Sequence, residues 1–281
     1  MEEHVTSLFV GVVSHERSRF AVSQGTEGLA ARLAEGLRDE GLSVDVRVNI
    51  DNLHDPACHP VDAEVVRRSV QAQSQLEQDW TSYLEKSTSA VASVRAAMAR
   101  YWRALESKVR PADESMVTRL INIELSHLDL FDAGLASGAP WVLVLEDDAM
   151  SENVSDCVAG LVGLLDGTSA PGFINLSHSF TLEELGVAHL LQPAGVSWQG
   201  SIERQILTAQ RPVTNTVCAV LYRAKFLEQL LATMRQLPFY PVVPIDWRIN
   251  QALMAMVEEG TAGQDTSWFV EPGPIDQMSM R

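Results

Sequence analysis

The sequence predicts a single α/β domain whose central sheet is mixed but mostly parallel, with helices on its faces. Residues 141–145 are an unbroken apolar run, as expected of a strand that helices cover on both sides. Residues 5–13, about 26–41 and 42–50 have the successive patterns of a buried strand, a helix and a second strand. That order favours a right-handed parallel unit at the start of the domain.

Apolar spacing and chain breakers predict the helices. Leucines recur at helical spacing in the first helix, and Gly41 is a natural end for it. Residues 62–109 are rich in Glu, Gln, Ala and Arg with few breakers, so we expect one or two long helices there. An apolar stripe predicts a shorter helix at 114–136. Further helices are predicted at 154–165, at 225–236 and over a stretch that ends near Val257.

Two more strands are predicted, at 172–176 and 217–222. Between them, residues 192–213 contain several prolines and glycines, which predicts an irregular, mobile loop. The chain has 281 residues and a 46% hydrophobic composition, which is enough for the sizeable core of one such domain.

Charge and cysteine usage restrict the expected partners and compartment. The formal net charge is −16, so nonspecific binding to nucleic acid or to an anionic membrane is disfavoured. Cys58, Cys157 and Cys218 are odd in number and widely spaced, which predicts reduced thiols without a zinc pattern. The N-terminal segment carries acids where a signal peptide needs positive charge. We therefore expect a cytoplasmic protein without a membrane anchor, and nothing in the sequence indicates its oligomeric state.

Three adjacent acids, Glu146, Asp147 and Asp148, directly follow the apolar run at 141–145. Because strand side chains alternate, Glu146 and Asp148 are expected on one side, where they offer the hard oxygen ligands that Mg²⁺ or Mn²⁺ prefers. Asp147 faces elsewhere and could accept a hydrogen bond from a ribose or a sugar. The alternative is that Asp148, or Ser151, only caps the next helix. Repulsion among three neighbouring acids disfavours a purely structural role.

The turn after the first strand lacks the glycines of a dinucleotide fingerprint, and the chain has no phosphate loop of the G-K-S/T kind. A nucleotide would therefore be bound through a metal and side chains. Arg17 and Arg19 lie where they could contact a diphosphate, although exposed arginines are common in turns. Asp51, after the second strand, could bond the base or the ribose.

Four segments in this order resemble the glycosyltransferases of the family 25 type, known from lipooligosaccharide synthesis, which adopt the nucleotide-diphospho-sugar transferase (GT-A) fold. The resemblance covers about residues 115–150 and 212–280. It rests on INIELSHLDLFDAGLASGAPWVLVLEDDA, PVTNTVCAVLYRAKFLEQLL, PIDWRIN and FVEPGPIDQMSM.

The resemblance implies roles for the acids. Asp148 would be the principal ligand of Mn²⁺ or Mg²⁺, with Glu146 or Asp147 on the metal or the donor ribose. Asp246 would be the general base, although it could instead cap the helix that follows it. Many transferases of this fold use a late histidine as a ligand, and this chain has none after His189, so Asp276, Gln277 or another oxygen donor would supply the C-terminal ligand.

Other residues have both a functional and a structural interpretation. His127 would contact the donor, or pack in the core beside its apolar stripe. Thr214 and Asn215 would contact the acceptor sugar, or simply begin a strand. Trp247 would stack on a sugar ring, or belong to the core.

The expected function is metal-assisted transfer, with inversion, of a hexose from a nucleoside diphosphate sugar, by the resemblance a UDP-sugar. The acceptor would be a hydroxyl of a carbohydrate, a lipid-linked or a small molecule. Residues 1–150 would bind the donor and 151–281 the acceptor. A nucleotidyltransferase is disfavoured, because its glycine-rich phosphate loop is missing. A noncatalytic binding protein on a degenerate transferase fold is the other alternative.

Overall fold

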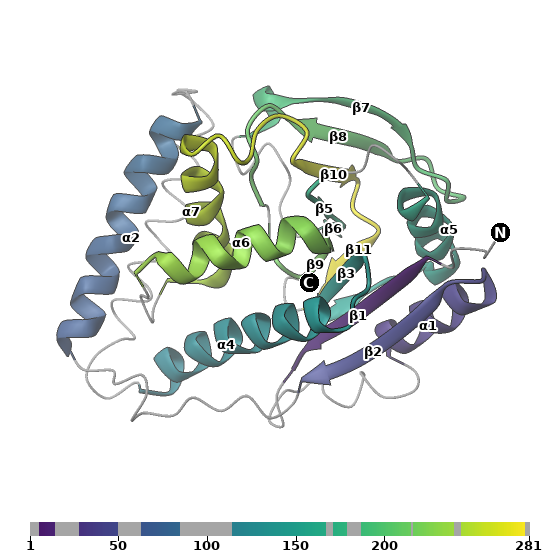
Figure 1. The fold of residues 1–281 in the computed structure, drawn as a ribbon, viewed down its shortest axis with the longest axis horizontal. Helices are drawn as coiled ribbons and strands as arrows, with labels where there is room; N and C mark the ends of the chain where they lie inside the picture. Colours follow the sequence, from purple (N-terminus) through teal and green to yellow (C-terminus); the bar gives the residue numbers. More distant parts are fainter. Residues whose placement is uncertain are drawn as a thin grey trace.

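An eight-stranded sheet forms the centre of the molecule, with its strands in the order β2-β1-β3-β9-β5-β10-β8-β7 (Figure 1). The computed structural model of the chain describes residues 6–14, 28–49, 63–84, 114–166, 171–178, 187–214, 216–238 and 243–278. The first half of the chain contributes one edge of this sheet and the second half the rest. Strands from both halves therefore share one hydrogen-bonded layer.

The N-terminal part of the sheet agrees with the sequence. Strand β1 pairs in parallel with β2 on one side and with β3 on the other. The helix between β1 and β2 buries the predicted leucine stripe against the sheet. The predicted strand, helix and strand are thus confirmed, and the apolar run at 141–145 lies in the interior of the sheet. The bounds are β1 Ser7–Val13, α1 Leu29–Asp39, β2 Ser43–Asn49 and β3 Trp141–Glu146.

The C-terminal part of the sheet is more antiparallel than expected. Strand β9 runs antiparallel to both of its neighbours, β3 and β5, and β8 runs antiparallel to β10 and β7. Among the described strands, four of the seven neighbouring pairs are antiparallel, so the prediction of a mostly parallel sheet is not confirmed. A buried strand has the same apolar composition whether it runs parallel or antiparallel to its neighbours, so the sequence pattern does not reveal its direction. The bounds are β5 Phe173–Asn175, β9 Ala219–Arg223 and β10 Ser267–Glu271.

The prediction of an irregular loop over residues 192–213 is wrong, because most of this segment forms a hairpin. Strands β7 (Leu191–Ser197) and β8 (Gln205–Ala209) pair in an antiparallel manner, with an irregular register between Pro193 and Ser197. Strand β7 is the edge of the sheet, where a proline needs no ladder partner for its missing N–H. Gly195 has a φ of 74° and accommodates the irregularity. The breakers therefore mark an edge strand.

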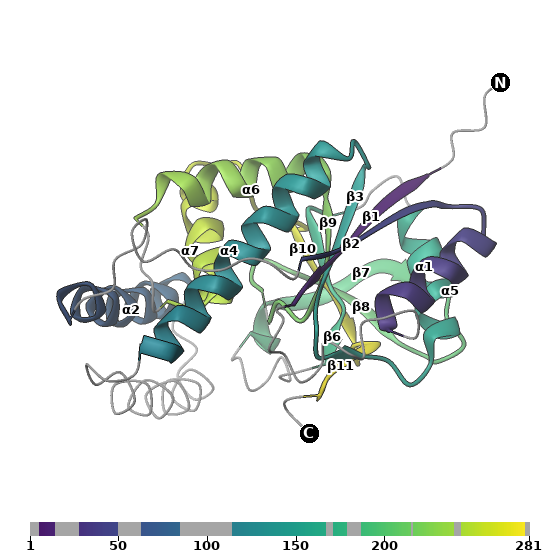
Figure 2. The same ribbon diagram turned by 90° about the horizontal axis from the view of Figure 1, so that it is seen from below.

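Helices cover both faces of the sheet (Figure 2). Helices α1 and α5 pack on one face, and α4, α6 and α7 on the other, with α2 beside α7. The predicted helices near 114–136, 154–165 and 225–236 are confirmed, while residues 85–109 lie outside the described part. No described helix has the length and apolar character to span a membrane. The bounds are α2 Ala63–Tyr83, α4 Glu114–Ala136, α5 Val154–Leu165, α6 Ala224–Gln236 and α7 Ile245–Glu258.

Candidate active site

The three acids connect the large sheet to a small one. Strand β3 ends at Glu146 and β4 (Ala149–Met150) begins three residues later, so Asp147 and Asp148 form the turn between the sheets. The small sheet has the order β4-β11-β6, with β6 at Ser177–His178 and β11 at Ile275–Gln277. The N–H of Met278 donates to the carbonyl of Asp148 at 2.9 Å. The C-terminal segment thus holds the acidic turn in place.

Glu146 and Asp148 converge with a thiol. One ligand atom from each of Glu146, Asp148 and Cys218 lies within 4.8 Å of the other two. The backbone N–H of Glu146 donates to the carbonyl of Cys218 at 2.8 Å, as an extension of the β3–β9 pairing. Gln277 Nε2 donates to Glu146 Oε2 at 3.1 Å and orients that carboxylate. Glu146, Asp148 and Cys218 are called the acid–thiol group below.

Asp148 is the most informative member of this group. Its side chain is only 6% exposed, and Oδ1 is buried without any hydrogen-bond partner in the described part of the chain. Leaving a buried polar atom unpaired costs free energy, and more so if it is charged. A bound cation would satisfy that oxygen. The residues present therefore fit a divalent metal held by carboxylates.

The helix-cap alternative for Asp148 and Ser151 is wrong. The N-cap of α5 is Asn153, whose side chain accepts a hydrogen bond from the N–H of Asp156 at 3.0 Å. Ser151 Oγ accepts from the N–H of Asn153 and approaches Cys157 Sγ to 3.1 Å, so it supports the turn before the helix. Asp148 takes no part in capping the helix.

Cys218 was not predicted as a site residue, because no motif or regular spacing in the sequence links Cys218 to Glu146. Its pKa lies well above the usual value, because of burial first and then the charges of Glu146, Asp148, Asp276 and Asp147. All four carboxylates are therefore near the thiol. Asp276 is outside the acid–thiol group, although its backbone carbonyl lies 3.9 Å from Cys218 Sγ. A direct metal contact from the Asp276 carboxylate remains a prediction.

Asp147 lies against the end of β1. Ser14 Oγ donates to Asp147 Oδ2 at 3.0 Å, and the N–H of Ser14 bonds to the carbonyl of Asn49 at the end of β2. Asp147 is thus fixed at the carboxyl ends of three neighbouring parallel strands. Ligands of open α/β sheets bind at such ends.

Asp246 lies in the first turn of α7, where Pro244 is the N-cap, so the interpretation of Asp246 as the cap is wrong. Its side chain is half-buried. Burial raises the pKa of Asp246 to about 6, against the opposing effect of the backbone N–H groups of Trp247 and of Asp246 itself. A carboxylate with a pKa near the working pH suits a general base.

Helix α7, which carries Asp246, is anchored by a buried ion pair. Arg248 Nε lies 3.3 Å from Glu124 Oε1 of α4, and both side chains are almost fully buried. Arg248 Nη1 also donates to the carbonyl of Pro238 at 2.6 Å. Burial raises the pKa of Glu124 to about 7, against the opposing charge of Arg248. The pair fixes the start of α7 relative to α4.

A second contact ties α7 to the segment that leads to Cys218. Asn250 Oδ1 accepts from the N–H of Thr214 at 3.0 Å, one helical turn after Asp246. The four residue-to-residue steps from Thr214 to Cys218 span at most about 14 Å. Helix α7 therefore contacts the chain within about 14 Å of the acid–thiol group. Thr214 Oγ1 donates to the carbonyl of Thr216 at 3.0 Å, so this hydroxyl serves the internal network.

Two predicted ligand-contacting side chains belong to the core. Trp247 is 7% exposed and makes an edge contact with Trp80, with ring centroids 5.9 Å apart, so it cannot stack on a sugar in this conformation. His127 is fully buried, and its Nδ1 lies 2.9 Å from the carbonyl of Ile123. Burial lowers the pKa of His127 to about 4, which keeps the ring neutral near pH 7. Arg17, Arg19, Asp51 and Asn215 lie outside the described residues.

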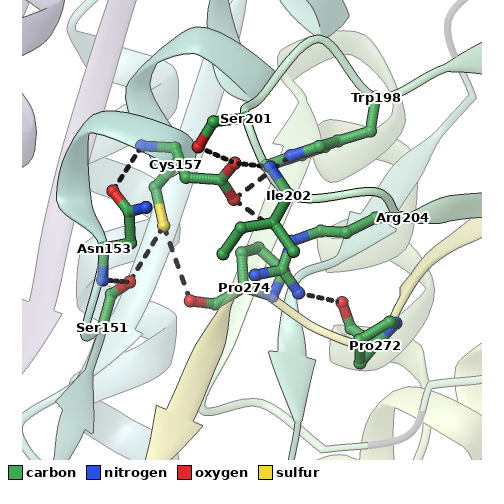
Figure 3. Close-up of polar contacts among 10 residues, drawn as sticks. Ser151, Asn153, Cys157, Trp198, Ser201, Ile202, Arg204, Pro272 and Pro274 are labelled. Atoms are coloured by element: carbon green, nitrogen blue, oxygen red, sulfur yellow. Dashed lines mark hydrogen bonds and ion pairs between the residues drawn. The ribbon is translucent and has the colours of Figure 1, made fainter.

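Polar contacts to the Asp156 carboxylate hold the turn of the β7–β8 hairpin against α5 (Figure 3). The Asp156 carboxylate accepts from the N–H of Ile202 at 2.7 Å and from Arg204 Nε at 3.2 Å. Trp198 Nε1 and Ser201 Oγ also donate to this carboxylate, both at 3.3 Å. Arg204 Nη1 then donates to the carbonyl of Pro272 at 2.5 Å. The cluster thus joins α5, the β7–β8 turn and the segment that leads to Asp276 and Gln277.

Comparison with known proteins adds no assignment, because no family model matches the chain and no curated protein matches it significantly.

Proposed function

We propose that this protein is a glycosyltransferase of GT-A fold that moves a hexose, with inversion, from a nucleoside diphosphate sugar to a hydroxyl acceptor. UDP-hexose is the expected donor, by the family resemblance of the sequence. The observation that carries the proposal is the buried Asp148 carboxylate beside Glu146 at the end of a central strand, with one oxygen that has no hydrogen-bond partner among the described residues.

The arrangement supports a division of roles. Glu146 and Asp148 would hold Mn²⁺ or Mg²⁺, which neutralises the charge that grows on the leaving diphosphate. Asp147, which accepts from Ser14 at the strand ends, would accept a further hydrogen bond from a ribose or sugar hydroxyl on the same edge. Asp246 would remove the proton of the acceptor hydroxyl as that oxygen attacks the anomeric carbon. Each role uses a carboxylate that the fold holds in a defined place.

Calorimetric titration of UDP, and then of GDP, into the full chain tests the nucleotide site. With Mn²⁺ present we expect UDP to bind, and we expect EDTA to abolish binding. Asp148→Asn should also abolish it, because the variant removes a charged metal ligand. Asp132→Asn is the matched control, since Asp132 is an exposed acid on α4 that pairs with Arg235 at 2.6 Å. Absence of nucleotide binding with and without metal would refute the proposal and favour a noncatalytic protein.

The pH dependence of turnover tests Asp246 as the base. Its pKa is raised from 3.8 to about 6, so the side chain is protonated and inactive below that pH. We expect kcat/KM to rise with pH and to level off above a midpoint near pH 6. Asp246→Asn should lower kcat by about a hundredfold to ten-thousandfold and leave UDP binding intact.

Glu258→Gln is the control for this prediction, because Glu258 is exposed in the last turn of the same helix. It should keep both the activity and the pH profile. An Asp246→Asn variant that turns over at the normal rate would show that another group is the base.

A further inference from the structure

The acid–thiol group differs from an all-oxygen metal site because it includes Cys218. The thiol is fully buried beside Glu146 and Asp148, and its sulfur lies 3.9 Å from the backbone carbonyl of Asp276. Mg²⁺ and Mn²⁺ prefer carboxylate, carbonyl and water oxygens as ligands and bind sulfur weakly. Zn²⁺ and Cd²⁺ accept sulfur and carboxylate ligands together. The group therefore has a donor that the proposed transferase metal leaves unused.

We propose that Glu146, Asp148 and Cys218 form a binding site for a thiophilic divalent cation, with Zn²⁺ as the expected ion. Two carboxylate oxygens and the sulfur would bind the metal, and the thiol proton would pass to solvent. Water would complete a four-coordinate shell. Zinc binding stands independently of the transferase activity. Bound zinc would exclude Mn²⁺ from the same carboxylates and so inhibit the transferase. Only this inhibition rests on the proposed function.

The distances suit this assignment. In a tetrahedral zinc site, with Zn–O near 2.1 Å and Zn–S near 2.3 Å, neighbouring ligand atoms lie roughly 3.3–3.8 Å apart. The three ligand atoms lie within 4.8 Å of one another, so each pair needs to approach by at most about 1.0–1.5 Å. The half-buried Glu146 side chain can supply that movement by rotating, while its backbone stays bonded to Cys218 at 2.8 Å.

A separate observation points to a cation. Asp148 Oδ1 is buried and has no hydrogen-bond partner in the described part of the chain, and a second carboxylate, that of Glu146, lies beside it. A fold that placed this atom for structural reasons alone would be expected to give it a donor. Zinc also binds nitrogen, oxygen and sulfur sites more tightly than Mn²⁺ in general, so a site of this kind would favour it at equal concentration.

Ultraviolet absorption during titration with Cd²⁺ tests the proposal, because only a bound thiolate produces a sulfur-to-metal charge-transfer band. The full chain would be used in a Cys58→Ser background, since Cys58 lies outside the described residues. We expect the band in this background and in Cys157→Ser, and its loss in Cys218→Ser and Cys218→Ala. Cys157 is the matched control, because it is also buried but bonds to Ser151 and Pro274. Circular dichroism would verify that each variant is folded.

Competition titration gives the second measurement. Loss of the Cys218 sulfur should weaken Zn²⁺ binding by at least about tenfold to a hundredfold, since loss of an outer-shell group alone costs that much. Mn²⁺ binding should change little. A band that survives in both Cys218 variants, or no band in any protein, would overturn the zinc assignment. A Cys218-dependent band without Mn²⁺-dependent UDP binding would support the zinc site and refute the transferase.

Discussion

Asp148→Asn is expected to lower turnover of a UDP-sugar by on the order of a thousandfold, which corresponds to the several kcal/mol that a metal contributes to charge stabilisation. The reason is that Asp148 is buried, lies at the end of a central strand, and has an oxygen without a hydrogen-bond partner in the part of the chain that the structure describes. The amide keeps the size of the side chain but loses the negative charge that a hard cation needs. Initial rates with saturating acceptor, with and without Mn²⁺, measure the effect.

The same substitution should not unfold the protein. Without metal, the buried Asp148 carboxylate lies close to Glu146, so a neutral amide relieves a like-charge repulsion. We expect the metal-free variant to be at least as stable as the parent in urea denaturation. Mn²⁺ should raise the Tm of the parent and not that of the variant, because only binding to the folded state stabilises it. A variant that loses activity because it unfolds would contradict a metal-binding role.

Asp156→Ala is expected to lower the free energy of unfolding by about 3–5 kcal/mol, the usual cost of leaving one member of a buried charge pair uncompensated. The Asp156 side chain is fully buried and the Arg204 side chain is 9% exposed, so removal of the carboxylate leaves the guanidinium without the opposite charge of this ion pair. Three further donors from the hairpin side also lose their acceptor. Urea denaturation at pH 7 is the measurement.

Asp132→Ala provides the comparison for this prediction. Its ion pair with Arg235 has a short distance, 2.6 Å, but both side chains are more than half exposed. Exposed pairs contribute about 0–1 kcal/mol, because water screens the charges and both side chains lose freedom. Equal effects of Asp132→Ala and Asp156→Ala would show that the Asp156 cluster contributes no special stability. A lower UDP affinity in Asp156→Ala alone would indicate that the cluster also positions the C-terminal segment.

The individual helices and strands could be predicted because the apolar pattern of each one lies within its own segment of the sequence. The valine alternation of β2, the leucine stripe of α1 and the apolar run of β3 each follow from burial at a fixed period. The position of Glu146 and Asp148 at the end of a covered strand follows from the same pattern. The hairpin at 191–209 was missed, because proline and glycine also occur in edge strands, and β7 is the edge of the sheet among the described strands.

The amino-acid sequence was enough to predict the α/β class, most helices and strands, and an acidic turn after a buried strand. Which side chains meet at that turn depends on the tertiary structure. Antiparallel pairing brings Cys218 to Glu146 across more than seventy residues, and the C-terminal strand brings Gln277 to the same carboxylate. The tertiary structure also places Trp247 and His127 in the core. The physical reason is that strand order and direction depend on contacts between distant segments, which periodicity within one segment does not encode.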